Sequence, residues 1–417
     1  METASQYRPE AGVVSPPMPR RTRILLPTLA SLAFVSLGLP DGLLGTAWPS
    51  MRASFGLPLD AQGALLLAGT VGYVGASFGA SHILSRLTLG RLLAASAFAT
   101  ALALLGYAAS PFWWVLVALA FVLGAGGGAI DAGINTWAST LHGPRMLNWL
   151  HACWGAGAAM GPAVVVLVLE TGRSWRLAYA LVGASQLALA VGLVLTSRSW
   201  TPTTAPTATG SAGSAGMSET LRLSAARLGA LVYFVHVGVE VGFGVWAFTL
   251  FTEGRGIAPA VAGFWLSVYW GGLTVGRLVA SFATARISPG ALVRSCLVAI
   301  SVGAALVWAD GADAVAFAGL ALAGLACGPV FPTLMATTPG RVGAPHVPHT
   351  VGLQVAAAAL GAALLPALMG VVAQRLGLET LGPQLLGLSV GTLLAHELLL
   401  RYHSRPVEIN NQGGGAA

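Results

Sequence analysis

Three carboxylic acids, Asp41, Asp131 and Glu240, interrupt the long apolar stretches of this chain, whereas most of its other charges lie between such stretches. An ionisable group at the centre of a bilayer costs at least about 2.5 kcal/mol, and it is retained where it faces an ion or substrate pathway. We therefore expect these acids to carry protons, and we expect Asp131 and Glu240 also to bind a solute.

Asp41 follows a proline in the run Leu39-Pro40-Asp41-Gly42. Proline removes one helical hydrogen bond and glycine loosens packing, so we expect an irregular helix at this point. One interpretation of Asp41 is a proton- or substrate-binding acid in a helix break. The alternative is a partly hydrated residue near the outer end of a helix.

Asp131 and Asn135 stand four residues apart among small residues, and Trp137 follows two residues later. A spacing of four puts two side chains on one face of a helix. A carboxylate, an amide and an indole on neighbouring turns suit a sugar, whose hydroxyls need donors and acceptors and whose ring stacks on aromatic faces. The alternative is that Asn135 bonds a neighbouring helix while Trp137 fills the core.

His236 and Glu240 are also four apart, so they could share a proton. We see no cation in the same stretches to hold these acids ionised, and burial favours the neutral acid. The alternative is a neutral, purely structural Glu240. We count Trp246, Tyr269 and His151 as further candidates for binding substrate, although a lone histidine such as His151 is more often structural.

Other chemistry is not indicated by the sequence. Gly126-Gly127-Gly128 follows no strand and has no Lys-Ser/Thr pair, so it is not a phosphate-binding loop. His346 and His349 lack a third ligand, which makes them a poor metal site. Cys153, Cys296 and Cys327 are too few and too widely spaced for a metal or a disulfide framework. We expect no metal, no cofactor and no enzymatic activity.

The elements that carry these residues are predicted to be membrane helices. The chain has 417 residues, of which 55% are hydrophobic and 8% are charged, and its mean hydropathy is +0.76. A soluble protein is roughly one quarter charged, so the surrounding solvent must be lipid. Twelve apolar runs are long enough to cross a bilayer, which takes about 20 residues. They lie near residues 24–48, 61–83, 90–109, 112–140, 147–169, 176–196, 226–252, 260–284, 289–309, 313–338, 350–374 and 381–402.

A Pro-, Gly- and Ser-rich segment divides the twelve runs into two sets of six. The prediction is an all-α membrane protein with twelve helices in two pseudo-symmetric bundles. Its expected parts are a cytoplasmic tail (1–22), a first bundle (23–196), a cytoplasmic linker (197–224), a second bundle (225–403) and a cytoplasmic tail (404–417).

The arginines predict the orientation, because cytoplasmic loops carry an excess of basic residues. With the N-terminus inside, sixteen of the 21 basic residues, Arg277 among them, fall on the cytoplasmic side. The net charge of +7 therefore indicates membrane orientation, since no basic face for nucleic acid stands out. We expect a multi-pass protein of the inner cell membrane with both termini cytoplasmic. The remaining arginines are Arg52, Arg173, Arg176, Arg255 and Arg375.

A faint internal repeat supports the two bundles. A shift of 200 residues places Phe34, Val35, Gly38 and Gly42 over Phe234, Val235, Gly238 and Gly242. A shift of 197 places Gly75, Gly79 and Gly127 over Gly272, Gly276 and Gly324. Parallel halves of this kind bind their solute near the bilayer midplane, between them.

Together these residues resemble the major facilitator superfamily across roughly residues 20–405, and most closely its fucose/proton symporter type. The resemblance is carried by five stretches. They are Gly127 to Asn135, Leu147 to Pro162, Glu240 to Trp246, Gly271-Gly272 with Gly276-Arg277, and Gly328-Pro329 with Phe331-Pro332. The loop at 81–91 departs from the superfamily's usual pattern because it lacks the Asp. The resemblance implies that the acids of the first and fourth spans, Asp41 and Asp131, serve proton coupling and sugar binding.

The sequence thus predicts a secondary transporter that moves a small polar solute, such as a sugar, together with protons by alternating access. Its expected partners are that solute, protons and the lipid bilayer, and not nucleic acid. The alternative is a proton-driven exporter of amphipathic compounds, because 12 Trp and many apolar residues could line an apolar pocket. A third possibility is a membrane receptor or scaffold that keeps the fold without turnover.

Overall fold

The computed structural model describes residues 20–84, 86–141, 144–200, 215–283, 286–309 and 311–403, and these residues contain helices and no strand. Twelve of the helices have 20 residues or more. They are α1 (Arg20–Phe55), α2 (Gln62–Leu84), α3 (Leu89–Ala109), α4 (Trp113–Leu141), α5 (Pro144–Glu170), α6 (Trp175–Thr196), α8 (Ser224–Thr249), α9 (Pro259–Ala283), α10 (Pro289–Trp308), α11 (Asp313–Val342), α12 (Val347–Leu376) and α13 (Leu381–His403).

Each of the twelve predicted spans coincides with one of these helices, so the predicted fold class is confirmed. Eleven of the helices are long and apolar enough to cross a membrane by length and composition. The twelfth, α9, has 25 residues, which is sufficient length, but it carries Arg277 within it. The short elements are the 3₁₀ turns η1 (Leu59–Ala61), η3 (Ala344–His346) and η4 (Leu378–Thr380), the π turn η2 (Leu250–Gly254) and the helix α7 (Met217–Arg222).

One local expectation differs from the structure. Helix α1 continues through Pro27, Pro40 and Pro49, so the predicted helix break at Asp41 is wrong. The helix tolerates Pro40 because only one backbone bond is lost and the neighbouring turns remain bonded. Within the predicted linker, α7 is helical, while residues 201–214 lie outside the described part, as do most of the two predicted tails.

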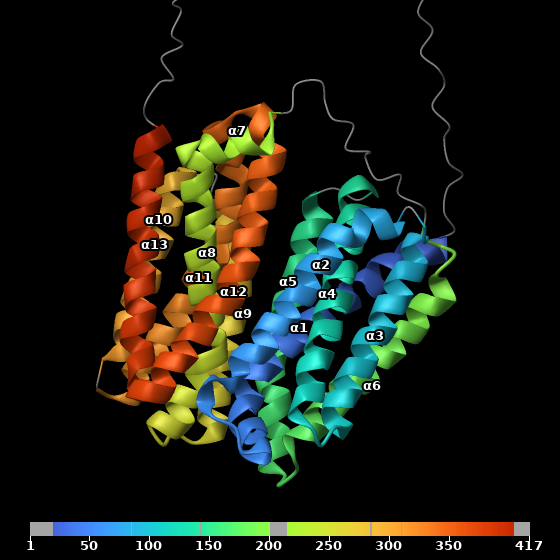
Figure 1. Cartoon of the computed structure of the whole chain (residues 1–417), viewed down its shortest axis with the longest axis vertical. Coiled ribbons are helices and arrows are strands. Elements are labelled where there is room, and N and C mark those ends of the chain that lie inside the picture. The colour runs from blue at the N-terminus through green and yellow to red at the C-terminus, as the bar shows by residue number, and fades with distance from the viewer. Residues whose placement is uncertain are drawn as a thin grey trace, which may run out of the picture.

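The helices form two halves with the same internal pairing, visible side by side in Figure 1. In the first half α1 packs on α5, α2 on α4, and α3 on α6. In the second half α8 packs on α12, α9 on α11, and α10 on α13. The pairs α1/α5 and α8/α12 lie where the halves meet, whereas α3/α6 and α10/α13 lie at the outer flanks (Figure 1).

Glycines at equivalent positions accompany this symmetry, because they let a neighbouring backbone come close, in most cases so close that a Cβ would clash. The repeat between α2/α4 and α9/α11 is a shift of 200 residues throughout, so the predicted second shift of 197 is wrong. The equivalent contacts are Gly72 with Phe121 and Gly272 with Ala321, Gly124 with Gly69 and Gly324 with Tyr269, and Gly128 with Tyr73 and Gly328 with Leu273.

Many of the contacts between the halves gather at the end of the molecule opposite the start of α1 and the end of α13. There Gly45 of α1 packs on the backbone of Gly244 in α8, and Gly63 of α2 packs on Ala367 in α12. The side chain of Arg52 donates to the Glu253 carboxylate at 2.6 Å. At the other end the two halves stand apart (Figure 1). The ribbons of the two halves are thus separated at the end that holds Arg20 and His403.

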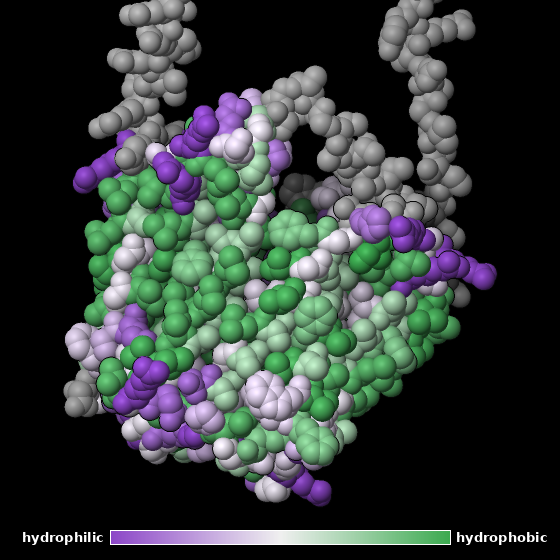
Figure 2. All heavy atoms as spheres, in the orientation of Figure 1, coloured by the Kyte–Doolittle hydropathy of each residue, from purple (hydrophilic) through white to green (hydrophobic). Residues whose placement is uncertain are grey.

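The surface of the molecule fits a lipid environment. Figure 2 shows a broad apolar band across the middle and hydrophilic residues gathered at the two ends. Large apolar side chains such as Leu195, Phe282 and Leu167 are exposed, at 79%, 80% and 65%. Exposed apolar area of this extent is the surface of a protein solvated by acyl chains, so this is a multi-pass membrane protein.

Candidate functional site

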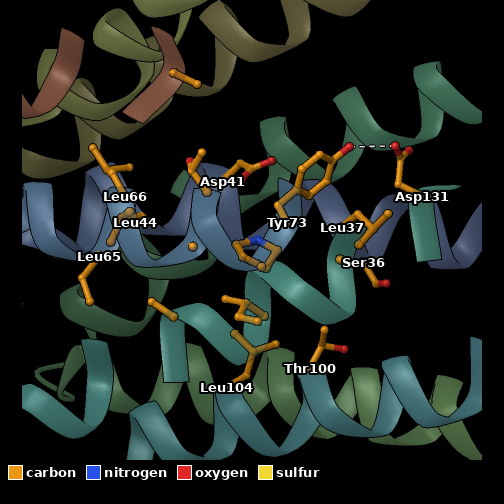
Figure 3. A pocket seen from close by; sticks show the side chains of 18 of the residues that line it. Ser36, Leu37, Asp41, Leu44, Leu65, Leu66, Tyr73, Thr100, Leu104 and Asp131 are labelled. Atoms are coloured by element: carbon orange, nitrogen blue, oxygen red, sulfur yellow. Dashed lines mark hydrogen bonds between the residues drawn. The ribbon is translucent and has the colours of Figure 1, made fainter. Parts of the chain in front are cut away.

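A cavity of about 350 Å³ lies where the two halves meet. Most of its lining comes from the six helices of the first half, Gln186 of α6 included, and Val241 of α8 with Ala359 and Ala362 of α12 complete it from the second half. Asp41 and Asp131 both line this cavity, and Figure 3 shows them on the same side of it. Its volume is within the range of sites that hold small molecules, about 300–1,000 Å³.

Asp41 lies deep in the membrane-spanning part of α1, roughly 30 Å from its first residue and roughly 20 Å from its last at 1.5 Å per residue. Its carboxylate accepts a hydrogen bond from the indole Nε1 of Trp154 in α5 at 3.1 Å. The side chain is exposed to the cavity. Glycines bring α1 and α5 together at this level, since Gly38 packs on the backbone of Trp154. Trp154 therefore holds the carboxylate in place while leaving it accessible.

Asp131 accepts hydrogen bonds from two side chains. The Tyr73 hydroxyl of α2 donates to one oxygen at 2.7 Å, and the Asn135 amide, one turn along α4, donates to the other at 2.9 Å. Gly128 allows the approach of α2, because its missing Cβ leaves room for the Tyr73 carbonyl and Ser77. Asn135 thus contacts Asp131 as its spacing predicted, but the second donor, Tyr73, comes from another helix.

Glu240 and His236 are buried in α8, with 6% and 1% of their surface exposed. The His236 Nε2 lies 3.7 Å from a Glu240 carboxylate oxygen. Arg277 of α9 interacts electrostatically with both groups, and Glu240 interacts electrostatically with Asp41 across the interface between the halves. The expectation that no cation accompanies these acids, with Arg277 on the cytoplasmic side, is therefore wrong.

Arg277 also reaches the first half of the molecule. Its guanidinium carbon lies 5.3 Å from the ring centroid of Trp154, a distance at which a cation is attracted to an aromatic face. His151, one turn before Trp154 on α5, interacts electrostatically with both Asp131 and Arg277 and packs edge-on against Phe34 at 5.6 Å. The structure therefore joins four of the predicted residues, Asp41, Glu240, Asp131 and His151, through Arg277 and Trp154.

Of the predicted site residues, Asp41 and Asp131 are the two that line the cavity. Three of the others are packed inside the bundles. Trp137 lies against Trp200 with ring centroids 5.1 Å apart. The Trp246 indole donates to the Pro366 carbonyl at 2.9 Å. The Tyr269 hydroxyl donates to the Glu240 backbone carbonyl at 2.7 Å. Tyr269 thus positions the helix turn that carries Glu240, whereas Trp137 and Trp246 fill the core.

Sequence reasoning missed Tyr73, Trp154 and Arg277 as site residues. Tyr73 stands in Gly72-Tyr73-Val74-Gly75, where a phenol among small residues indicated a polar group facing a close neighbour. Arg277 follows Gly276 inside an apolar run, and a cation in such a position is itself a signal of function. The error was to place Arg277 in a loop by its nearness to the end of the span.

Two six-helix halves around a central cavity with intramembrane acids define a membrane transporter. The sequence profile of the Major Facilitator Superfamily matches residues 30–252, and the chain belongs to this family. Family and fold are those of transporters, which are not enzymes.

Two curated proteins are similar over most of this chain. Bypass of stop codon protein 6 from Saccharomyces cerevisiae is 26% identical over 390 residues, which cover 84% of this chain and 77% of that protein. Sodium-dependent glucose transporter 1 from Danio rerio is 25% identical over 398 residues, which cover 82% of this chain and 64% of that protein.

Two solved structures share the fold. The nucleoside transporter NupG, as a mutant, superposes with a TM-score of 0.74 at 14% identity, covering 90% of this chain and 99% of that one. The fucose:proton symporter FucP from E. coli, also as a mutant, superposes with a TM-score of 0.61 at 17% identity, covering 93% and 100%. At these identities the likeness is one of fold.

Proposed function

We propose that this transporter moves a small polar solute, such as a sugar, together with protons by alternating access. The observation that carries the proposal is that Asp41 and Asp131, two acids deep in membrane-spanning helices, line one cavity between the halves. Inserting a carboxylate at such depth in a membrane costs free energy, and acids in this position mark ion or substrate pathways.

A hydroxylated ring suits the polar groups around this cavity. The Asp131 carboxylate, with Tyr73 and Asn135 beside it, offers hydrogen-bond acceptors and donors within a few ångströms. The indole of Trp154 supplies a flat aromatic face next to Asp41. The printed names of the similar proteins include glucose, a nucleoside and fucose, all of which carry hydroxylated rings.

The position of Arg277 between acids of the two halves supports proton coupling. Arg277 interacts with Glu240 in its own half and lies on Trp154, which holds Asp41 in the other half. Asp41 also interacts electrostatically with Glu240 of the other half. Two ionised acids repel one another across the interface, and a proton on either of them removes that repulsion and so changes the balance between contact and separation of the halves.

We place the termini, and with them the end at which the ribbons of the halves are separated, in the cytoplasm of a cell with a polarised inner membrane, as the arginine distribution indicates. A membrane potential of 100 mV supplies about 2.3 kcal/mol per charge, so one coupled proton supports roughly a forty-fold solute gradient. The described state would then be the one that releases solute inward.

Export of amphipathic compounds is the second candidate, because most of the cavity lining is apolar. Leu37, Leu44, Leu65, Leu66 and Leu104 all contribute to it. The same acids could drive antiport, so the direction of flux and the solute distinguish the two candidates.

The test uses the full chain in proteoliposomes with D-glucose, L-fucose and uridine as probes, under an imposed pH gradient or, separately, a sodium gradient. We expect saturable uptake of at least one probe driven by the pH gradient, with matching proton entry reported by an internal pH dye. Asp131→Asn should abolish the driven uptake. Asp313→Asn, at the exposed start of α11, is the matched control and should leave it unchanged.

Three results would count against the proposal. Uptake driven by sodium alone would overturn proton coupling. Efflux of a hydrophobic dye without uptake of any probe would favour export. Binding without flux would indicate a receptor.

A further inference from the structure

His151 stands at a level between Asp131 and the end of the molecule that holds Arg20. Consecutive long helices run in alternating directions from that end, so α4 ends there and α5 begins there. Asp131 lies about 15 Å from the last residue of α4, and His151 lies about 10 Å from the first residue of α5, at 1.5 Å per residue. The imidazole is therefore roughly one helical turn closer to this end than the carboxyl group.

The His151 side chain is exposed, although the residues around it hold it in place. Its ring packs edge-on against Phe34 of α1 with the ring centroids 5.6 Å apart, and Phe34 itself is buried. Close packing of Gly157 on the backbone of Val35 brings α1 and α5 together here. An imidazole that is both oriented and exposed can exchange protons with water without a change of fold.

Two charged groups from other helices act on this histidine. Asp131 of α4 and Arg277 of α9 both interact with His151 electrostatically, whereas Phe34, the ring packed against it, carries no charge. An ionised Asp131 attracts a proton onto the imidazole, and the Arg277 guanidinium repels it. His151 can therefore accept a proton from the acid without retaining it.

The surroundings of Asp131 also suit the loss of a proton. The Tyr73 hydroxyl and the Asn135 amide donate to its two oxygens at 2.7 and 2.9 Å. Donors of this kind stabilise the charged form of a carboxyl group. The carboxylate that remains after a proton has left is thus already hydrogen-bonded on both oxygens.

We infer that His151 is a proton relay, through which Asp131 discharges its proton toward the end that holds Arg20. The inference rests on the proposed proton-coupled transport and adds to it the residue that empties the acid. The O–H bond of Asp131 breaks, and the proton passes through a bridging water to a ring nitrogen of His151. The imidazolium then gives a proton to the water outside, so that the histidine ends neutral and Asp131 ends ionised.

The test compares transport that requires proton release with transport that does not. The full chain in proteoliposomes is assayed with D-glucose, L-fucose and uridine. Uptake driven by a pH gradient must release a proton in every cycle, whereas counterflow, the exchange of labelled for unlabelled solute at equal pH, can proceed with the proton still bound.

His151→Gln removes the titrating ring and keeps a polar side chain of similar size. We expect it to reduce driven uptake at least tenfold more than it reduces counterflow, because a positioned acid–base group accelerates proton transfer by a factor of that order or greater. His151→Asn, a second neutral replacement, should give the same difference. Counterflow in these variants also reports that they are folded.

His349 provides the matched control. It is a partly buried histidine two residues after the start of α12, in the other half of the molecule. His349→Gln should keep the ratio of driven uptake to counterflow found for the unaltered protein.

The outcomes separate the relay from the transport function. If the unaltered protein shows no uptake of any probe driven by the pH gradient, the proposed function fails and the relay fails with it. If the unaltered protein shows such uptake and both His151 variants match it, transport stands and the relay is overturned. Equal losses of driven uptake and counterflow in both variants would also overturn the relay, since a residue that binds solute or supports the fold acts on both.

Discussion

Arg277 of α9 lies over the indole ring of Trp154 of α5, 5.3 Å from the ring centroid, and so places a cation of the second half on an aromatic ring of the first. The same indole donates to the Asp41 carboxylate, and the same guanidinium interacts with Glu240. Close packing of Gly155 on Thr274 brings the two helices together at this level. A change of charge at Asp41 or Glu240 would therefore act on a contact that both halves share.

Replacing Trp154 with phenylalanine tests the link to Asp41. Trp154→Phe removes the indole N–H and keeps an aromatic ring beneath Arg277. Losing a hydrogen bond to a charged group costs about 1.5–3 kcal/mol, so we expect kcat/KM for coupled uptake to fall tenfold or more. Trp149→Phe is the control, since its indole donates only to Ser31 on the same half. Equal activity of the two variants would contradict the role of Trp154.

Removing the charge of Arg277 tests its electrostatic interaction with Glu240. Arg277→Gln takes away a cation that interacts with this buried acid, and a buried acid without a compensating charge destabilises the folded protein. We expect a clear fall in the thermal unfolding temperature in detergent. The double variant Arg277→Gln with Glu240→Gln should recover most of that loss, because no unpaired charge remains. Additive losses in the double variant would show that the two groups do not stabilise one another.

The ion pair between Arg52 and Glu253 joins the halves at the closed end, with both side chains 29% exposed. Exposed pairs contribute about 0.2–1 kcal/mol, so Glu253→Gln should shift the balance toward opening of this end by at most about fivefold. Accessibility of a cysteine introduced at Ala53 would report the shift. The control is Glu397→Gln, which breaks the bidentate pair with Arg294 inside the second half. A shift of the same size in the control would show that the ion pair between Arg52 and Glu253 does not hold this end closed.

Gly45→Ala tests, by a steric clash alone, whether close packing of the two halves keeps this end closed. The Cβ of Gly45→Ala would collide with the Gly244 carbonyl of the other half, a clash that disappears once the halves separate there. We expect spin labels at Ala53 and Leu376 to move apart in this variant, while the unfolding temperature changes little. Gly75→Ala is the control, because nothing lies within 4 Å of its Cβ. Unchanged label distances in Gly45→Ala would show that the contact can adjust.

Some contacts of the site could be predicted from the sequence and others could not, for reasons that differ from residue to residue. Asp131 and Asn135 could be paired because both stand on one helix, where a spacing of four fixes the distance between side chains. Tyr73 and Trp154 could not be paired with Asp131 and Asp41 from the sequence. These partners lie 58 and 113 residues away, and glycine contacts between the helices bring them together. Trp137, Trp246 and Tyr269 share the apolar pattern of their helices, which does not say whether a side chain faces a cavity or the core.

The sequence alone determined the twelve spans, because lipid requires about 20 consecutive apolar residues wherever a helix crosses, a condition that each segment meets independently of the others. It also determined which acids lie within those spans. Only the tertiary structure decided that Arg277 faces Glu240 rather than water, that the repeat shift is 200 throughout α2/α4 and α9/α11, and that the cavity enters the first bundle as far as Gln186. These features depend on how helices rotate and approach one another, and that is set by packing between residues distant in the chain.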